Sequence, residues 1–293
     1  MYMRDQIRHR IKAAGRTLSD ALKERFDFAK RVLKEGLGIE VESLEPIARG
    51  YNNKVYLLKI FPSSSPTAPP RALAPGCVPF PERTPEYLIF RTVRHVSQVP
   101  AARKLLNAVW MVEGKLPGVP MDELWQTADT AARLGMLEAL ADVLAKLKSM
   151  PVPSGSKYRF GGLTYDSDDK IVLGPTCLGY DEGPFTTAKE HYRAWIVGQW
   201  EDCKKNARAD GWKVDGLHER IEKFINDGLE STMSCLDDCE PVFIHADFGF
   251  LNTLVSETAP HVITGLLDYE WSHFGPPSDE YFVRYSQVAC PTS

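Results

Sequence analysis

Apolar and polar positions follow different patterns in the two halves of the chain. In the first half, an amphipathic pattern predicts a helix in two pieces that extends to about Glu35 and ends at Gly36. After it, short apolar runs bounded by Gly, Asn and Pro predict β-strands. These strands are expected over residues 41–50, 51–61, 86–91 and 105–112.

In the second half, apolar residues recur mainly at helical spacing. Helices are expected over residues 129–149, 187–207 and 216–235, with Thr186 or Thr187 and Asp215 as N-caps, and a hairpin is expected over 162–173. Two short apolar runs, Val242–Ile244 and Val262–Leu267, predict strands that each lead into polar residues. The chain is therefore expected to be an α+β protein with a β-rich first part and a mainly helical second part.

A Gly/Pro-rich segment, residues 113–120, predicts a domain boundary after residue 113. The expected domains are residues 1–113 and 114–293. The first carries an insert over residues 62–85 whose eight prolines exclude a helix interior or a central strand. A long loop is expected there.

Composition narrows the class of protein. Hydrophobic residues make up 43% and charged residues 25%, as in ordinary globular proteins. A net charge of -4 gives no electrostatic footprint for nucleic acid, and no apolar run reaches the roughly 18 residues of a membrane helix. Six scattered cysteines favour a reduced, cytoplasmic protein. The basic residues before Leu18 leave a mitochondrial-targeting segment as the minor alternative to a surface helix.

The candidate chemistry lies around the two last apolar runs. His245 and Asp247 follow the first run, Asn252 comes five positions after Asp247, and Asp268 ends the second run. A carboxylate can act as general base, and amide and carboxylate oxygens are ligands that Mg²⁺ prefers. This spacing is that of the catalytic loop and metal-binding Asp of kinases. A loop Asp that only makes turn hydrogen bonds is the structural alternative.

The first part offers a candidate phosphate-binding turn. Gly50, Asn52 and Asn53 tolerate unusual backbone dihedrals and can present N–H groups to an anion. Most such turns are plain hairpins, so the functional interpretation depends on the second half. Arg91 lies near the end of the third predicted strand.

These residues resemble the aminoglycoside phosphotransferase family of small-molecule kinases. The resemblance rests on three segments, His-Ala-Asp-Phe-Gly-Phe-Leu-Asn (245–252), Leu-Leu-Asp-Tyr-Glu-Trp (266–271) and Gly-Pro-Pro-Ser-Asp (275–279). It implies a two-lobed protein-kinase-like fold that uses ATP and Mg²⁺, with a small-molecule hydroxyl as acceptor and no nucleic acid or membrane partner. The proline-rich insert resembles the largely fungal branch.

The resemblance also implies roles by position. Asp247 would be the base, with His245 holding its loop. Asn252 and Asp268 would be the magnesium ligands, and Arg91 the phosphate contact. Residues 111–115, including Val112 and Glu113, would form the hinge that meets adenine through its backbone.

Two departures from the family pattern support an alternative. Residues 92–112 contain no Asp or Glu, so Arg91 is expected to lack an acidic partner, and the chain ends 23 residues after Glu270, as in a shortened family member. The expected function is ATP- and Mg²⁺-dependent phosphotransfer to a hydroxyl. The alternative is a catalytically impaired pseudoenzyme that binds nucleotide or serves as a scaffold. A metal-dependent phosphoesterase would need a second ligand cluster.

Overall fold

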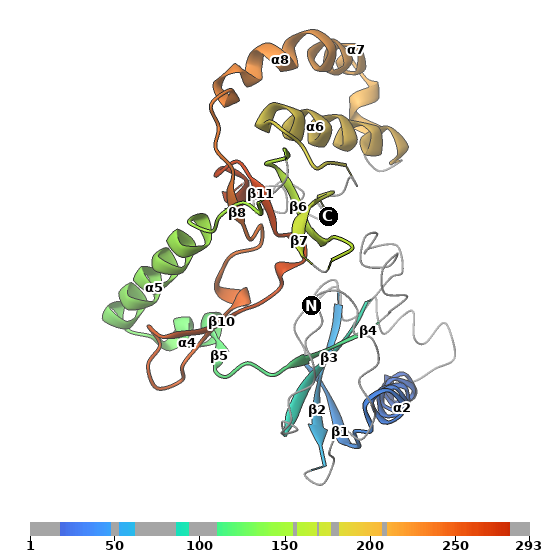
Figure 1. Ribbon diagram of the computed structural model, residues 1–293, viewed down its shortest axis with the longest axis vertical. Coiled ribbons are helices and arrows are strands. Elements are labelled where there is room, and N and C mark those ends of the chain that lie inside the picture. Colours follow the sequence, from blue (N-terminus) through green and yellow to red (C-terminus); the bar gives the residue numbers. More distant parts are fainter. Residues whose placement is uncertain are drawn as a thin grey trace. The chain divides into compact units, whose positions relative to one another are not determined.

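The computed structural model describes residues 18–47, 53–61, 86–93, 110–154, 157–168, 170–176, 182–206 and 210–281. The chain divides into two compact units, Met1–Lys115 and Leu116–Ser293. The described part of the first unit is mostly strand and that of the second mostly helix, which confirms the α+β class (Figure 1). The predicted boundary after residue 113 lies two residues before the division.

One helix and one antiparallel sheet make up the described part of the first unit. Its elements are α2 (Leu18–Leu37), β1 (Val41–Ile47), β2 (Asn53–Ile60), β3 (Tyr87–Val93) and β4 (Trp110–Gly114). The strands lie in the order β1-β2-β3-β4. In β3, Arg91 pairs with Val55 of β2 on one side and with Met111 of β4 on the other.

The core of the first unit lies between α2 and one face of the sheet. Ala29 and Leu33 of α2 form one buried cluster with strand residues such as Tyr56 and Phe90. Fully burying each large side chain contributes about 1.5–3 kcal/mol. Because successive strand residues point to opposite faces, Arg91 lies on the face turned away from α2.

Several expectations for the first unit fall on residues outside the described ranges. These are the helix before Leu18, residues 62–85 and most of the segment after Arg91. Gly50 and Asn52 also lie outside, whereas Asn53 begins β2. The strand expected over 105–112 is described from Trp110 and continues to Gly114.

The second unit combines helices with short strands. Its helices and strands are β5 (Val119–Pro120), α4 (Met121–Thr127), α5 (Thr130–Lys148), β6 (Gly161–Tyr165), β7 (Ile171–Gly174), α6 (Ala188–Lys205), α7 (Leu217–Lys223), α8 (Leu229–Thr232), β8 (Val242–Ile244), β9 (Thr253–Val255), β10 (Ile263–Leu266) and β11 (His273–Gly275). Short 3₁₀ segments are Asp210–Lys213, Met233–Leu236, Phe250–Asn252 and Tyr269–Trp271, and Phe224–Gly228 forms a π-helix.

Local signals explain most of these helices. Thr187 caps α6 with a full capping box, in which its hydroxyl accepts from Glu190 N–H and Glu190 accepts from the Thr187 N–H. Asp215, expected as the next N-cap, does not cap α7. The N-cap is Gly216 at φ 66°, and the single helix expected over 216–235 is interrupted by the π-helix.

Two sheets of the second unit join segments that are distant in sequence. Their strand orders are β10-β9-β5 and β7-β6-β11-β8. The late strand β11 therefore lies between β6 and β8, with His273 paired to both Gly162 and Ile244. In the part of the chain that the structure describes, no helix is long and apolar enough to cross a membrane.

Candidate active site

The catalytic loop, defined here as residues 245–252, connects the two sheets of the second unit. It leaves β8 of one sheet and enters β9 of the other. The residues at both of its ends, Ile244 and Thr253, are fully buried, and the Thr253 hydroxyl donates to the Gly249 carbonyl at 2.8 Å. Both ends of the loop are thus anchored in packed structure.

Glu280 fixes the backbone at the start of the loop. Its carboxylate accepts the His245 N–H at 2.8 Å and the Ala246 N–H at 3.1 Å, and the side chain is almost fully buried. Ala246 has a φ of 67°, in the left-handed region that costs a non-glycine residue about 1–2 kcal/mol. The two N–H groups donate to the Glu280 carboxylate, and these hydrogen bonds hold the unusual backbone in place.

The His245 side chain is internal and holds the loop backbone. Its Nδ1 accepts the Asp247 N–H at 3.3 Å, and its ring packs 4.6 Å from the Tyr269 ring. Burial lowers the pKa of His245, although Glu280 and the nearby Leu267 backbone act in the opposite direction. The ring is therefore neutral, and because Nδ1 accepts, its hydrogen lies on Nε2, which makes no hydrogen bond of normal geometry.

Asp247 and Asn252 orient one another. The Asn252 Nδ2 donates to the Asp247 carbonyl at 2.9 Å and to its Oδ2 at 2.7 Å. Both of those oxygens are acceptors, so the amide nitrogen must face them and the amide Oδ1 points elsewhere. Among the described residues, no hydrogen bond occupies the other oxygen of each side chain, Asp247 Oδ1 and Asn252 Oδ1.

Asp268 reaches the same loop through the backbone. The Leu267 N–H donates to the Asn252 carbonyl at 2.8 Å, which places the residue after β10 beside the end of the loop. Asp268 has φ 61° and ψ 59°, a left-handed conformation that turns the chain sharply at this point. Asp268 and Asn252 supply hard oxygen donors, a set that fits Mg²⁺ with waters and phosphates completing its shell.

In the first unit, Arg91 has an acidic partner. Its guanidinium lies 3.5 Å from the Glu113 carboxylate, with the Arg91 side chain 15% and that of Glu113 37% exposed. The expectation that Arg91 lacks an acid is therefore wrong. The partner comes from the neighbouring strand β4 and lies diagonally across the ladder from Arg91 on the same sheet face.

Two of the first-unit candidates, Val112 and Glu113, lie on an edge strand of the described sheet. In the described sheet β4 is an edge strand, so every second residue along it turns its backbone N–H and C=O groups away from β3. Val112 and Glu113 are adjacent residues of this strand. The Val112 side chain itself packs against the core beneath α2. Asn53 is the first residue of β2.

Glu280 is the residue that sequence reasoning missed. From its sequence, the Gly-Pro-Pro-Ser-Asp segment (275–279) predicts a turn into a helix, with Asp279 as an N-cap or as a buried acid that braces the catalytic loop. Asp279 is buried, but it binds His191, His273 and Tyr192, and the next residue braces the loop. The signal available in the sequence was the pair of adjacent acids, Asp279 and Glu280, directly after the Gly-Pro-Pro-Ser turn.

Comparisons with known proteins give the family. No curated protein matches the chain. Among solved structures, a thermostable mutant of aminoglycoside phosphotransferase APH(4)-Ia in ternary complex with AMP-PNP and hygromycin B is similar at 14% identity and a TM-score of 0.44, covering 86% of this chain and 74% of that one. Macrolide 2′-phosphotransferase MphH from Brachybacterium faecium is similar at 15% identity and a TM-score of 0.40, covering 89% and 77%.

The model of the phosphotransferase enzyme family, APH, matches residues 43–283. This range includes both described sheets of the second unit, the catalytic loop and the strands of the first unit except the first two residues of β1. The chain therefore belongs to the APH phosphotransferase family.

Proposed function

We propose that the protein transfers the γ-phosphoryl group of ATP, with Mg²⁺, to a hydroxyl group of a small molecule. The observation that carries the proposal is the mutual orientation of Asp247 and Asn252. Their hydrogen bonds leave one carboxylate oxygen for an acceptor hydroxyl and one amide oxygen for a cation. A kinase active site needs those two functions side by side.

Asp247 acts as the base. Its Oδ1 accepts the proton of the acceptor hydroxyl while that oxygen forms a bond to the γ-phosphorus and the bond from phosphorus to the bridging oxygen of ADP breaks. The Asn252 hydrogen bond to Oδ2 fixes the carboxylate plane. Positioning of this kind supplies much of the catalysis in phosphoryl transfer, where the protein forms no covalent intermediate.

Asn252 and Asp268 would hold the magnesium ion. When bound, Mg²⁺ neutralises charge that develops on the phosphates. The chain's own contribution is the sharp left-handed turn at Asp268 and the backbone bond from Leu267, which together set the carboxylate beside the loop.

His245 and Glu280 are positioning residues in this mechanism. The neutral His245 ring accepts the Asp247 N–H, and Glu280 holds the two residues before Asp247. A buried neutral imidazole bonded to backbone is poorly placed to carry a proton between solvent and substrate. It instead limits the orientations that Asp247 can adopt.

In the first unit, the sheet face opposite α2 would receive the nucleotide. Arg91 would contact phosphate, and its partner Glu113 would hold the guanidinium in place. The edge of β4 at Val112 and Glu113 offers backbone N–H and C=O groups for adenine. The turn at Gly50, Asn52 and Asn53 would supply N–H groups to phosphate.

The test measures Mg²⁺-dependent ATP turnover and nucleotide-induced thermal stabilisation of the wild type and Asp247→Asn. Asp142→Asn, the same change at an exposed acid on α5, is the matched control. We expect Asp247→Asn to lose at least about 100-fold in kcat, because general-base catalysis contributes roughly 10²–10⁴-fold. Nucleotide stabilisation without turnover in the wild type would show a pseudoenzyme, and no nucleotide response would refute both functions.

A further inference from the structure

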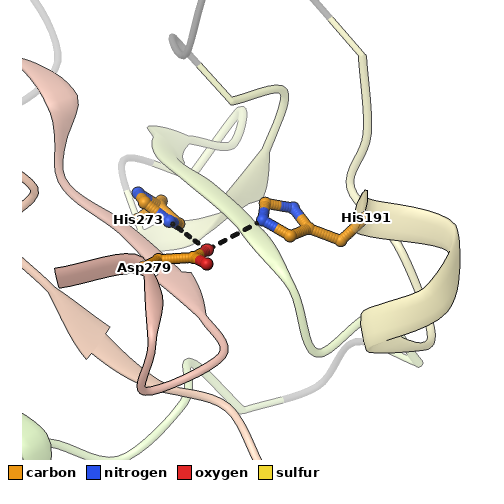
Figure 2. A group of neighbouring side chains, drawn as sticks. All are labelled: His191, His273 and Asp279. Atoms are coloured by element: carbon orange, nitrogen blue, oxygen red, sulfur yellow. Dashed lines mark hydrogen bonds and ion pairs between the residues drawn. The ribbon is translucent and has the colours of Figure 1, made fainter. Parts of the chain in front are cut away.

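A second cluster of titratable side chains lies beneath the catalytic loop. Asp279 Oδ2 is 3.0 Å from His191 Nε2 and 3.1 Å from His273 Nε2, and its Oδ1 accepts a hydrogen bond from the Tyr192 hydroxyl (Figure 2). His191, His273 and Asp279 are fully buried. The proposed phosphoryl transfer uses none of them directly.

Counting hydrogens at His273 fixes the charge of this cluster. Its Nδ1 lies 2.9 Å from the Trp271 carbonyl, which can only accept, and its Nε2 faces the Asp279 carboxylate. With an ionised Asp279, both ring nitrogens donate, which is the arrangement of an imidazolium. Although burial acts to raise the pKa of Asp279, the bonds from the two histidines lower it to about 2, so the carboxyl is ionised.

The groups around His273 and Asp279 add no further charge to this pair. Burial raises the pKa of Tyr192 and that of Cys239, and the charge on Asp279 raises both further. Both groups are therefore neutral. The carboxylate of Glu280, the next residue, is directed to the two loop N–H groups. The cluster is a buried ion pair, His273 with Asp279, in which His191 and Tyr192 donate two further hydrogen bonds.

Two imidazoles and a carboxylate within 4.8 Å of one another are also a ligand set for a metal ion such as zinc. Structural zinc sites are almost always four-coordinate, whereas the group that the described residues form has three members. A dication with one carboxylate and two neutral imidazoles would also bury a net positive charge. The proton leaves the buried site neutral, so we favour the proton over the metal.

The ion pair holds both structures that fix the catalytic loop. His273 lies on β11 and pairs with Ile244, the residue before the loop. Asp279 directly precedes Glu280, whose carboxylate binds the His245 and Ala246 N–H groups. The pair therefore ties the strand beside the loop to the acid that braces it, and His191 ties both to α6.

We propose that His273 is a positioning residue for phosphoryl transfer: as an imidazolium paired with Asp279, it fixes β11 and Glu280 where they hold the catalytic loop. The proposal rests on the proposed function for its kinetic test only. Its structural test needs no turnover.

The first experiment determines the proton directly. Histidine ring nitrogens are observed by NMR in the full-length protein labelled with ¹⁵N-histidine, and His273→Gln and His191→Gln identify the signals. We expect the His273 ring to carry hydrogen on both nitrogens at neutral pH. A neutral His273 tautomer, or one zinc ion per chain by elemental analysis of the purified protein, would overturn the proposal.

The second experiment measures what the pair does for the loop. Asp279→Asn keeps the side-chain shape and removes the charge, and Asp142→Asn is the control. We expect at least tenfold faster amide exchange at His245 and Ala246, with kcat about tenfold lower and KM for ATP changed less than about threefold, since tenfold corresponds to the loss of one ordinary hydrogen bond. If the pair of His273 and Asp279 only stabilises the fold, the folded Asp279→Asn variant will keep the wild-type kcat, and this result would contradict the proposal.

Tyr192→Phe keeps the test decisive where Asp279→Asn does not fold. It removes the hydrogen bonds of the Tyr192 hydroxyl with Asp279 and Ser278 and keeps the ring in its packing against Trp195. The same loop amides should exchange faster, by a smaller factor. Unchanged exchange at these amides in both variants would overturn the proposal. If the wild type shows no turnover, the proposed function fails, and the exchange result still decides this inference.

Discussion

Substitution of Glu280 by Gln should weaken the catalytic loop more than any other single change outside it. The carboxylate accepts two backbone N–H groups, at 2.8 and 3.1 Å, with both of its oxygens. A Gln side chain has one oxygen and one NH₂ group, so one buried N–H would face another donor. The second hydrogen bond would survive but would lose its charge.

The expected cost follows from those two bonds. A hydrogen bond to a charged group contributes about 1.5–3 kcal/mol and a neutral one about 0.5–1.5 kcal/mol. Losing one bond and neutralising the other therefore costs roughly 3 kcal/mol, reduced by whatever desolvation of the carboxylate is relieved. The free energy of unfolding of a domain is about 5–15 kcal/mol, so the variant should still fold. Its catalytic loop should open more often.

Urea unfolding and amide exchange test this expectation. Glu280→Gln should lower the free energy of unfolding by roughly 3 kcal/mol and remove the exchange protection of His245 and Ala246. Glu257→Gln, at an exposed turn, should change neither. If Glu280→Gln lowers the free energy of unfolding by less than about 1 kcal/mol and is no different from the control, the two hydrogen bonds do not hold the loop.

Three further expectations follow from the same structure. Gly275→Ala would place a Cβ 2.7 Å from Asp279 Oδ2 and should lower the free energy of unfolding, measured in urea, by about 1–3 kcal/mol. Gly211→Ala, whose Cβ meets nothing within 4 Å, should lower it by less than half as much. Equal losses in the two variants would contradict the close packing at Gly275. Because the folded-state pKa of Asp279 is lowered to about 2, the stability that its carboxylate contributes is present above pH 4 and is lost as the pH falls towards 2. Between those pH values, the free energy of unfolding of Asp279→Asn should therefore fall by about 2 kcal/mol less than that of the wild type. Parallel curves of unfolding free energy against pH for the two proteins would count against the lowered pKa. Glu113→Gln should change stability by less than about 1 kcal/mol, since the ion pair is partly exposed, yet raise KM for ATP through the loss of the partner that positions Arg91; an unchanged KM would remove Arg91 from the nucleotide site.

The local parts of the site could be predicted from the sequence because they depend on neighbours along the chain. An apolar run that stops at a polar residue marks where a strand ends: β8 ends at Ile244, directly before His245, and β10 ends at Leu266, two residues before Asp268. The spacing of five residues between Asp247 and Asn252 suits the loop that their side chains close.

The long-range parts could not be predicted. Glu280 reaches the His245 and Ala246 N–H groups across 35 and 34 residues, because β11 inserts between β6 and β8, and no periodicity records that strand order. The partner of Arg91 was missed for a related reason. Residues 92–112 contain no acid, and the partner is Glu113, a diagonal cross-strand neighbour that lies one residue beyond them. At Asp215, a left-handed backbone next to a left-handed glycine prevented the expected cap.

The strand order of the second sheet also sets the sequence of events during synthesis. β6 and β7 leave the ribosome long before β11, which must enter between β6 and β8, and Glu280 follows β11. The nascent chain therefore contains Asp247, Asn252 and Asp268 before it contains the acid that orders their loop. A premature stop between Asp268 and Glu280 would yield a product that has Asp247, Asn252 and Asp268 but lacks the carboxylate that binds the His245 and Ala246 N–H groups.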